Sequence, residues 1–78
     1  MKYHGIELKE FVSDKPVAFN PPKKMLCWDV ERDIELDESY CKNVDTWLPA
    51  GTGQPYARAV TINKNQWLHC AEMPEGEK

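Results

Sequence analysis

Residues 26–36 decide the fold, and they read Leu26-Cys27-Trp28-Asp29-Val30-Glu31-Arg32-Asp33-Ile34-Glu35-Leu36. Even positions carry apolar side chains except at Arg32, and odd positions from Asp29 onward carry acids. A period of two predicts a strand with one dry face and one wet face. Because the run is about twice the usual strand length, we expect a tight turn near residues 31–33 or one long bent strand. A helix ranks second, since its apolar face would include Asp37.

The acids of this stretch are the first candidate for a binding surface. Six acids and one arginine lie between residues 29 and 38, in a chain whose formal charge is −3. On a strand, alternate carboxylates lie about 6.6–6.8 Å apart, close to the spacing of phosphates along one nucleic-acid strand. We expect a partner-binding row made of Asp29, Glu31, Asp33, Glu35 and Asp37. The plainer alternative, a solvated edge strand whose charges prevent aggregation, stays open.

The remaining segments predict further short strands. Residues 56–62 and 66–73 are rich in β-forming side chains and flank Asn63-Lys64-Asn65, which indicates a hairpin. Within its second strand, Trp67, His69 and Ala71 should share one face. Six prolines argue against long helices, and residues 17–22 are typical of an extended arm with a stiff polyproline-like end. Residues 37–45 are polar and predict a loop or a single helical turn.

Together these segments predict a mainly β fold with little helix. We expect a small antiparallel sheet curled into a barrel or half-barrel and packed by Trp28, Trp47 and Trp67. With 78 residues the chain has room for one small β-rich domain, over residues 1–73, followed by a flexible tail over residues 74–78.

Composition and termini narrow the cellular context. No window approaches the length of apolar chain that a membrane span requires, and the first residues lack the apolar stretch of a secretory signal. We therefore expect a cytoplasmic protein that does not insert into membranes. Three cysteines in such a chain favour reduced thiols. Direct nucleic-acid binding is disfavoured, because the sequence pI is about 5.3 and no basic stripe occurs.

The residues that bear reactive groups do not form a recognisable catalytic or metal motif. The nominal zinc ligands are His4, Cys27, Cys41, His69 and Cys70. No C-x-x-C pair, the usual spacing in a structural zinc site, occurs among them. His69 and Cys70 are neighbours on a predicted strand, so their side chains should point to opposite faces. We therefore expect no metal, no cofactor and no enzymatic activity.

A second hypothesis is a small-ligand site. Trp47, Tyr56 and the loop Gly51-Thr52-Gly53 could line a pocket for a nucleotide signal at a dimer interface, since aromatic faces stack on bases and loop amides donate hydrogen bonds to phosphate. The Walker pattern is absent, because Gln54 and Pro55 follow the glycines. If the chain forms a homodimer, we expect the strand of Ile62 or Trp67 to form the dimer interface.

Two blocks of sequence resemble small uncharacterised accessory proteins of tailed bacteriophages and prophages. They are Pro21-Pro22-Lys23-Lys24-Met25-Leu26-Cys27-Trp28-Asp29 and Gln66-Trp67-Leu68-His69-Cys70-Ala71-Glu72-Met73-Pro74-Glu75. The resemblance implies a phage accessory protein and supplies no catalytic residues. We therefore expect a non-enzymatic binding protein in the host cell, such as an inhibitor of a host defence or nucleic-acid-processing protein, that acts through the acidic strand face.

Overall fold

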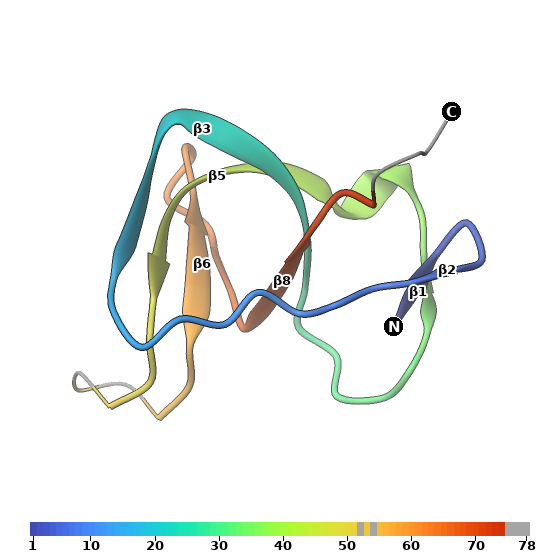
Figure 1. The fold of residues 1–78 in the computed structure, drawn as a ribbon, viewed down its shortest axis with the longest axis horizontal. Helices are drawn as coiled ribbons and strands as arrows, with labels where there is room; N and C mark the ends of the chain where they lie inside the picture. The colour runs from blue at the N-terminus through green and yellow to red at the C-terminus, as the bar shows by residue number, and fades with distance from the viewer. Residues whose placement is uncertain (52, 54, 75–78) are drawn as a thin grey trace.

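Five antiparallel strands form a curled sheet that makes up a half-barrel (Figure 1). The computed structural model describes residues 1–51, 53 and 55–74 of the chain. In their order across the sheet, the strands are β7 (Gln66–Trp67), β6 (Arg58–Thr61), β5 (Cys41–Leu48), β3 (Val17–Trp28) and β8 (His69–Glu72). The prediction of a mainly β fold with a small curled antiparallel sheet is confirmed.

A second, smaller sheet lies beside the half-barrel (Figure 1). Its strands, in spatial order, are β2 (Ile6–Glu7), β1 (Lys2–Tyr3) and β4 (Glu35–Leu36), and β1 pairs with β4 in parallel. A 3-10 turn, η1 (Glu38–Tyr40), joins β4 to β5 and is the helical element of the described residues. The expectation of a loop or single helical turn therefore holds for the first part of residues 37–45 and fails from Cys41 onward, where β5 begins.

One stretch of chain, residues 66–72, supplies both edges of the larger sheet. β7 pairs with β6, β8 pairs with β3, and the chain bends at Leu68 between them. The Leu68 amide donates to Asp29 Oδ1 at 2.8 Å, just beyond the end of β3. We call this corner, where β7, β8 and the end of β3 meet around Leu68, the barrel seam.

The predicted hairpin is confirmed where β6 and β7 pair across Asn63-Lys64-Asn65. Lys64 has a φ of 71°, the left-handed conformation that a tight turn uses. The predicted alternation beyond the turn holds for His69 and Ala71, which lie on the outer side of the sheet, but it is wrong for Trp67, because the bend at Leu68 breaks the period of two. Trp67 packs inside the half-barrel, whereas Ala71 faces the opposite side of the sheet.

The end of β3 is buried on both faces, and this divides the core in two. The inner cluster fills the half-barrel and consists of Met25, Cys27, Val44, Trp47, Ala59 and Cys70. The outer cluster lies between β3 and the smaller sheet and consists of Tyr3, Leu26, Trp28, Leu36 and Ala71. Trp28 and Trp47 are buried as predicted, but in different clusters, and Trp67 is partly buried against the inner one.

The prediction that residues 26–36 form one strand, or two strands with a tight turn, is wrong. β3 ends at Trp28, residues 29–34 form an irregular connection, and only Glu35 and Leu36 pair again, in the smaller sheet. The apolar side chains of this stretch do turn inward, because Leu36 is buried and Val30 and Ile34 pack against the outer cluster. The carboxylates therefore do not form a row along one strand.

The predicted arm is part of the longest strand. Residues 17–22 belong to β3, and the β3–β5 register shifts between Ala18 and Lys23, around the prolines. Prolines are tolerated where the ladder is interrupted in this way, since they cannot donate a ladder hydrogen bond. β5 was not expected, because a second shift between Val44 and Thr46 breaks its alternation and places Val44 and Trp47 in the same cluster.

Residues 8–11, which we call the strap, run along the free edge of β8. Glu10 forms a bridge with Ala71, and the Phe11 amide donates to the Cys70 carbonyl at 2.8 Å. Phe11 also meets Trp47 edge-on, with ring centroids 5.2 Å apart. The strap therefore covers one edge of the sheet and seals the inner cluster.

Candidate functional site

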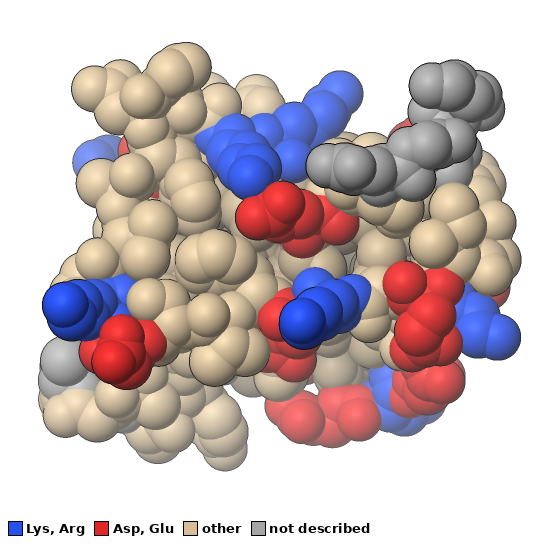
Figure 2. All heavy atoms as spheres, viewed as in Figure 1, with Lys and Arg blue, Asp and Glu red and all other residues tan. Residues whose placement is uncertain are grey.

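The five acids expected to bind a partner each contact a donor of their own chain. Asp29 accepts from the Leu68 amide (2.8 Å), Glu31 lies 3.3 Å from His69 Nε2, Asp33 contacts the Met1 ammonium, Glu35 accepts from the Gly5 amide (2.7 Å) and Asp37 accepts from the Ser39 amide (2.9 Å). On the face drawn in Figure 2 the carboxylates lie in several groups with a Lys or Arg beside them. These acids thus hold loops in place, and no continuous acidic row is formed.

Two of these carboxylates are held in the charged form by their partners. The hydrogen bond to the Met1 ammonium lowers the pKa of Asp33, and hydrogen bonds from the Ser39 hydroxyl and amide lower the pKa of Asp37. Asp37 is also the N-cap of η1. Both carboxylates are therefore charged at neutral pH, and each stabilises a local contact of the chain.

His69 joins the strap to the connection that follows β3. Its Nδ1 lies 2.8 Å from Glu10 Oε2 and its Nε2 lies 3.3 Å from Glu31 Oε2, while its ring stacks on Trp28 with centroids 5.7 Å apart. Burial alone would lower the pKa of His69, but the hydrogen bonds to the two carboxylates outweigh it, so the pKa is raised. Because the carboxylates lie on opposite nitrogens of one ring, they do not converge on a common point where a metal could bind.

The nominal metal ligands and nucleophiles do not gather into one metal site within the described part of the chain. Within residues 1–51, 53 and 55–74, no group of three His, Cys, Asp or Glu side chains has the geometry to hold a metal ion. Cys27 and Cys70 are buried, and Cys41 is half-buried near Met73. His4 Nε2 lies 2.8 Å from Glu38 Oε2, three residues before Cys41 in the chain.

The predicted ligand pocket does not form as expected, because Trp47 is only 2% exposed and packs within the inner cluster. Its ring is therefore not available to stack on a base. Gly51 and Gly53 adopt positive φ angles of 97° and 82°, which suits a turn between β5 and β6. Thr52 lies outside the described residues. Of the two predicted aromatic residues, only Tyr56 is accessible, with 56% of its surface exposed.

Tyr56 instead borders a hollow at the barrel seam. The hollow has a volume of about 350 Å³ and is lined by Asp29, Pro55, Tyr56, Arg58, Gln66, Trp67 and Leu68, and we call it the seam hollow. Its walls come from the loop before β6, from β6 and β7, and from the end of β3. The structure thus combines one residue from each of the two predicted sites, Asp29 and Tyr56, with residues predicted for neither.

Two donors beside the seam hollow lack acceptors. Arg58 Nη1 donates to Gln66 Oε1 at 2.7 Å, but Arg58 Nε and Trp67 Nε1 are buried without a hydrogen-bond partner among the described residues. Leaving a buried donor unpaired costs about 1–3 kcal/mol, so such groups often indicate a missing partner. Lys42 Nζ lies over the Trp67 ring system, 5.3 Å from a ring centroid.

Arg58 and Gln66 were missed because nothing in the local sequence marks them. A lone arginine between two alanines is typical of an ordinary strand residue. The signal that could have found them is the hairpin register: pairing of Val60 with Gln66 brings Arg58 and Gln66 to the same face, two residues apart on a diagonal.

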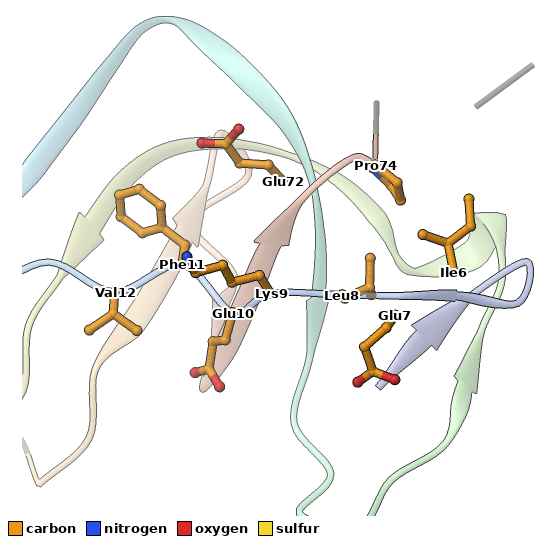
Figure 3. A pocket seen from close by; sticks show the side chains of 9 residues that line it. All are labelled: Ile6, Glu7, Leu8, Lys9, Glu10, Phe11, Val12, Glu72 and Pro74. Carbon is orange, nitrogen blue, oxygen red and sulfur yellow. The ribbon is translucent and has the colours of Figure 1, made fainter. Parts of the chain in front are cut away.

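A larger hollow, of about 640 Å³, lies along the strap (Figure 3). In Figure 3, Ile6 and Leu8 lie on the side of Pro74, whereas the carboxylates of Glu7 and Glu10 point the other way. Pro74 is the last described residue of the chain.

Comparison with known proteins adds no assignment to this geometry. None of the helical structure in the described residues is long and apolar enough to cross a membrane. No protein-family model, no curated protein and no solved structure matches the chain.

Proposed function

We propose that the protein is a non-enzymatic binding protein whose seam hollow receives a carboxylate-bearing apolar segment of a partner protein. The observation that carries the proposal is Arg58, whose guanidinium is held by Gln66 on one side and whose Nε–H has no acceptor among the described residues. A fixed guanidinium edge matches a carboxylate in two parallel hydrogen bonds, which is among the stronger polar contacts a protein surface can make.

The apolar part of the partner is indicated by the neighbours of Arg58. Tyr56 is exposed, and Pro55 and Leu68 complete the wall of the seam hollow. Tyrosine offers a large ring with few rotatable bonds, and tyrosine and arginine are enriched among the residues that dominate binding energy in interfaces. A side chain that is apolar and next to an acid therefore fits this surface.

Charge favours a polypeptide over the nucleotide of the alternative hypothesis. Among the residues that the structure describes, the lining holds one cation, Arg58, and one anion, Asp29, and it includes no lysine. A phosphate group would meet the Asp29 carboxylate without a second cation to offset it. A peptide brings both a carboxylate for Arg58 and backbone N–H groups, for which the second oxygen of Asp29 is an acceptor.

The wider biological role remains a prediction. A host protein as partner, inhibition of host defence or of nucleic-acid processing, and a cytoplasmic location follow from the resemblance to phage accessory proteins and from the sequence alone. A binding role for the five acids also stays a prediction, now without the geometry of a strand face, and dimerisation through the edge at Ile62 or Trp67 has the same standing.

A titration followed by NMR tests the proposal directly. The ¹H–¹⁵N signals of Arg58 Nε–H and Trp67 Nε1–H report on the two unpaired donors. The probe is a short peptide with blocked ends that carries Phe beside Glu, and its counterpart carries Gln in place of Glu. We expect the Arg58 signal to move with the Glu peptide and to move far less with the Gln peptide.

Variants separate the seam hollow from general charge effects. Arg58→Gln should abolish the response of the Trp67 signal, while Lys64→Asn removes one positive charge from the turn between β6 and β7, outside the hollow lining, and should leave the response intact. Equal responses to the Glu and Gln peptides would overturn the proposal. A response to AMP but not to the peptide would favour the small-ligand alternative in its place.

A further inference from the structure

Cys27 and Cys70 face each other across the β3–β8 ladder. They are direct register partners, both are fully buried, and both belong to the inner cluster. Opposite residues of paired strands point to the same face of a sheet, so the two thiols share one side. The pair is thus defined by register and by burial, two independent observations.

The hydrogen-bond pattern shows that this is the closer kind of cross-strand pair. The Cys70 carbonyl accepts from the Phe11 amide of the strap, so it points away from β3. In an antiparallel ladder, a residue whose polar groups point away from its neighbour forms a non-hydrogen-bonded pair, with Cα atoms about 4.5 Å apart. That separation lies inside the range of about 4.4–6.8 Å found for disulfides.

We propose that Cys27 and Cys70 are a latent disulfide site. Their disulfide bond forms when the half-barrel opens locally in the presence of a small-molecule disulfide. One thiolate attacks the small disulfide, forms a mixed disulfide and releases one small thiol. The second thiolate attacks the protein sulfur of that bond and releases the other small thiol. The two cysteines lose two protons and two electrons in total, and the small disulfide gains them as two thiols.

Burial explains why the pair stays reduced in the folded half-barrel. Burial raises the pKa of both thiols to about 12, and the attacking species is the thiolate. Because both residues have 0% exposure, an oxidant reaches them only after β8 or the strap separates from its neighbours. The rate of disulfide formation should therefore follow the rate of opening.

Cys41 provides a matched internal control. It pairs with Leu26 across the edge of β3 that faces β5, and its side chain packs against the outer cluster. There its sulfur lies 3.8 Å from that of Met73. It is more accessible than the other two cysteines but lies on the wrong face to bridge to either of them. A random oxidation would select Cys41 first, whereas the ladder geometry selects Cys27 and Cys70.

The experiment exposes the full chain to glutathione disulfide at urea concentrations below the unfolding midpoint. Thiol titration and non-reducing peptide mass spectrometry then identify the bond. We expect free thiols to fall from three to one, with a Cys27–Cys70 cross-link, and the Cys41→Ser variant to give the same cross-link. Preferential bonding of Cys41, or glutathione adducts on Cys27 and Cys70 without a cross-link, would overturn the proposal.

A second measurement tests whether the bond fits the native ladder. Disulfides typically stabilise small domains, and the oxidised Cys41→Ser protein should melt roughly 10 °C above its reduced form. An unchanged or lower melting temperature would contradict a disulfide that fits the closed barrel. This inference is independent of the seam hollow, so the two proposals stand or fall separately.

Discussion

Replacing Leu36 with alanine should remove a large share of the stability of this protein. Leu36 is 1% exposed and fills the space between Tyr3, Trp28 and Leu26 in the outer cluster. Truncating a buried leucine costs about 2–5 kcal/mol, because apolar contact is lost and a cavity remains. A domain of 78 residues holds about 4–12 kcal/mol in total, so a loss of about 3 kcal/mol is about a quarter of its stability or more.

Urea denaturation followed by tryptophan fluorescence measures this loss. With a slope of about 1–3 kcal/mol per molar urea, a loss of about 3 kcal/mol lowers the midpoint by about 1–3 M. Val12→Ala is the control, because Val12 is 76% exposed and its truncation should shift stability by less than about 0.5 kcal/mol. If Leu36→Ala behaves like Val12→Ala, the smaller sheet does not seal the outer cluster, and our account of residues 29–36 is wrong.

Three further predictions concern the barrel seam and its surroundings. Because the pKa of His69 is raised in the folded state, its contribution to stability is complete below the unfolded pKa of about 6.5 and is lost as pH rises through the folded pKa. Urea midpoints measured between about pH 5 and 9 should therefore fall with pH in the wild type and change less in His69→Gln. Asp29→Ala removes the acceptor of the seam amide and should lower stability by about 1 kcal/mol, whereas Asp29→Asn keeps an oxygen and should cost less; equal losses in urea denaturation would argue against that hydrogen bond. Trp67→Phe deletes an unpaired buried N–H and should change stability by less than about 1 kcal/mol, and a loss of more than about 2 kcal/mol by the same assay would show that the N–H is satisfied.

Local patterns in the sequence were sufficient for the fold class and for the hairpin. The turn of Asn63-Lys64-Asn65 acts over a few residues, so its strands pair where expected. The strand prediction for residues 26–36 fails because a period of two indicates which side chains are buried but not which part of the structure covers them. Leu26 and Leu36 both lie in the outer cluster, one on β3 and one on the smaller sheet. A register shift hides β5 in the same way, since no sequence pattern marks its bulge.

The candidate site was less predictable, since it depends on contacts far apart along the chain. Asp29 and Tyr56 were singled out for two different sites, and the seam hollow unites them because residues 66–72 bend at Leu68. Trp47 is buried in the inner cluster, because the bulge in β5 turns it inward, and the sequence alone does not mark that bulge. Arg58 gains its significance only from Gln66 and from its unpaired nitrogen, and neither can be read from its sequence neighbours.

The use of residues 66–72 for both edges of the larger sheet sets the order in which the chain can fold. During synthesis β3, β5 and β6 leave the ribosome with both outer edges unpaired, and neither edge finds its partner until this late segment appears. Closure then requires contacts between distant parts of the chain, and such contacts slow folding. A nascent or truncated chain that stops before β7 would carry two open strand edges, and we expect it to aggregate or to be captured by chaperones.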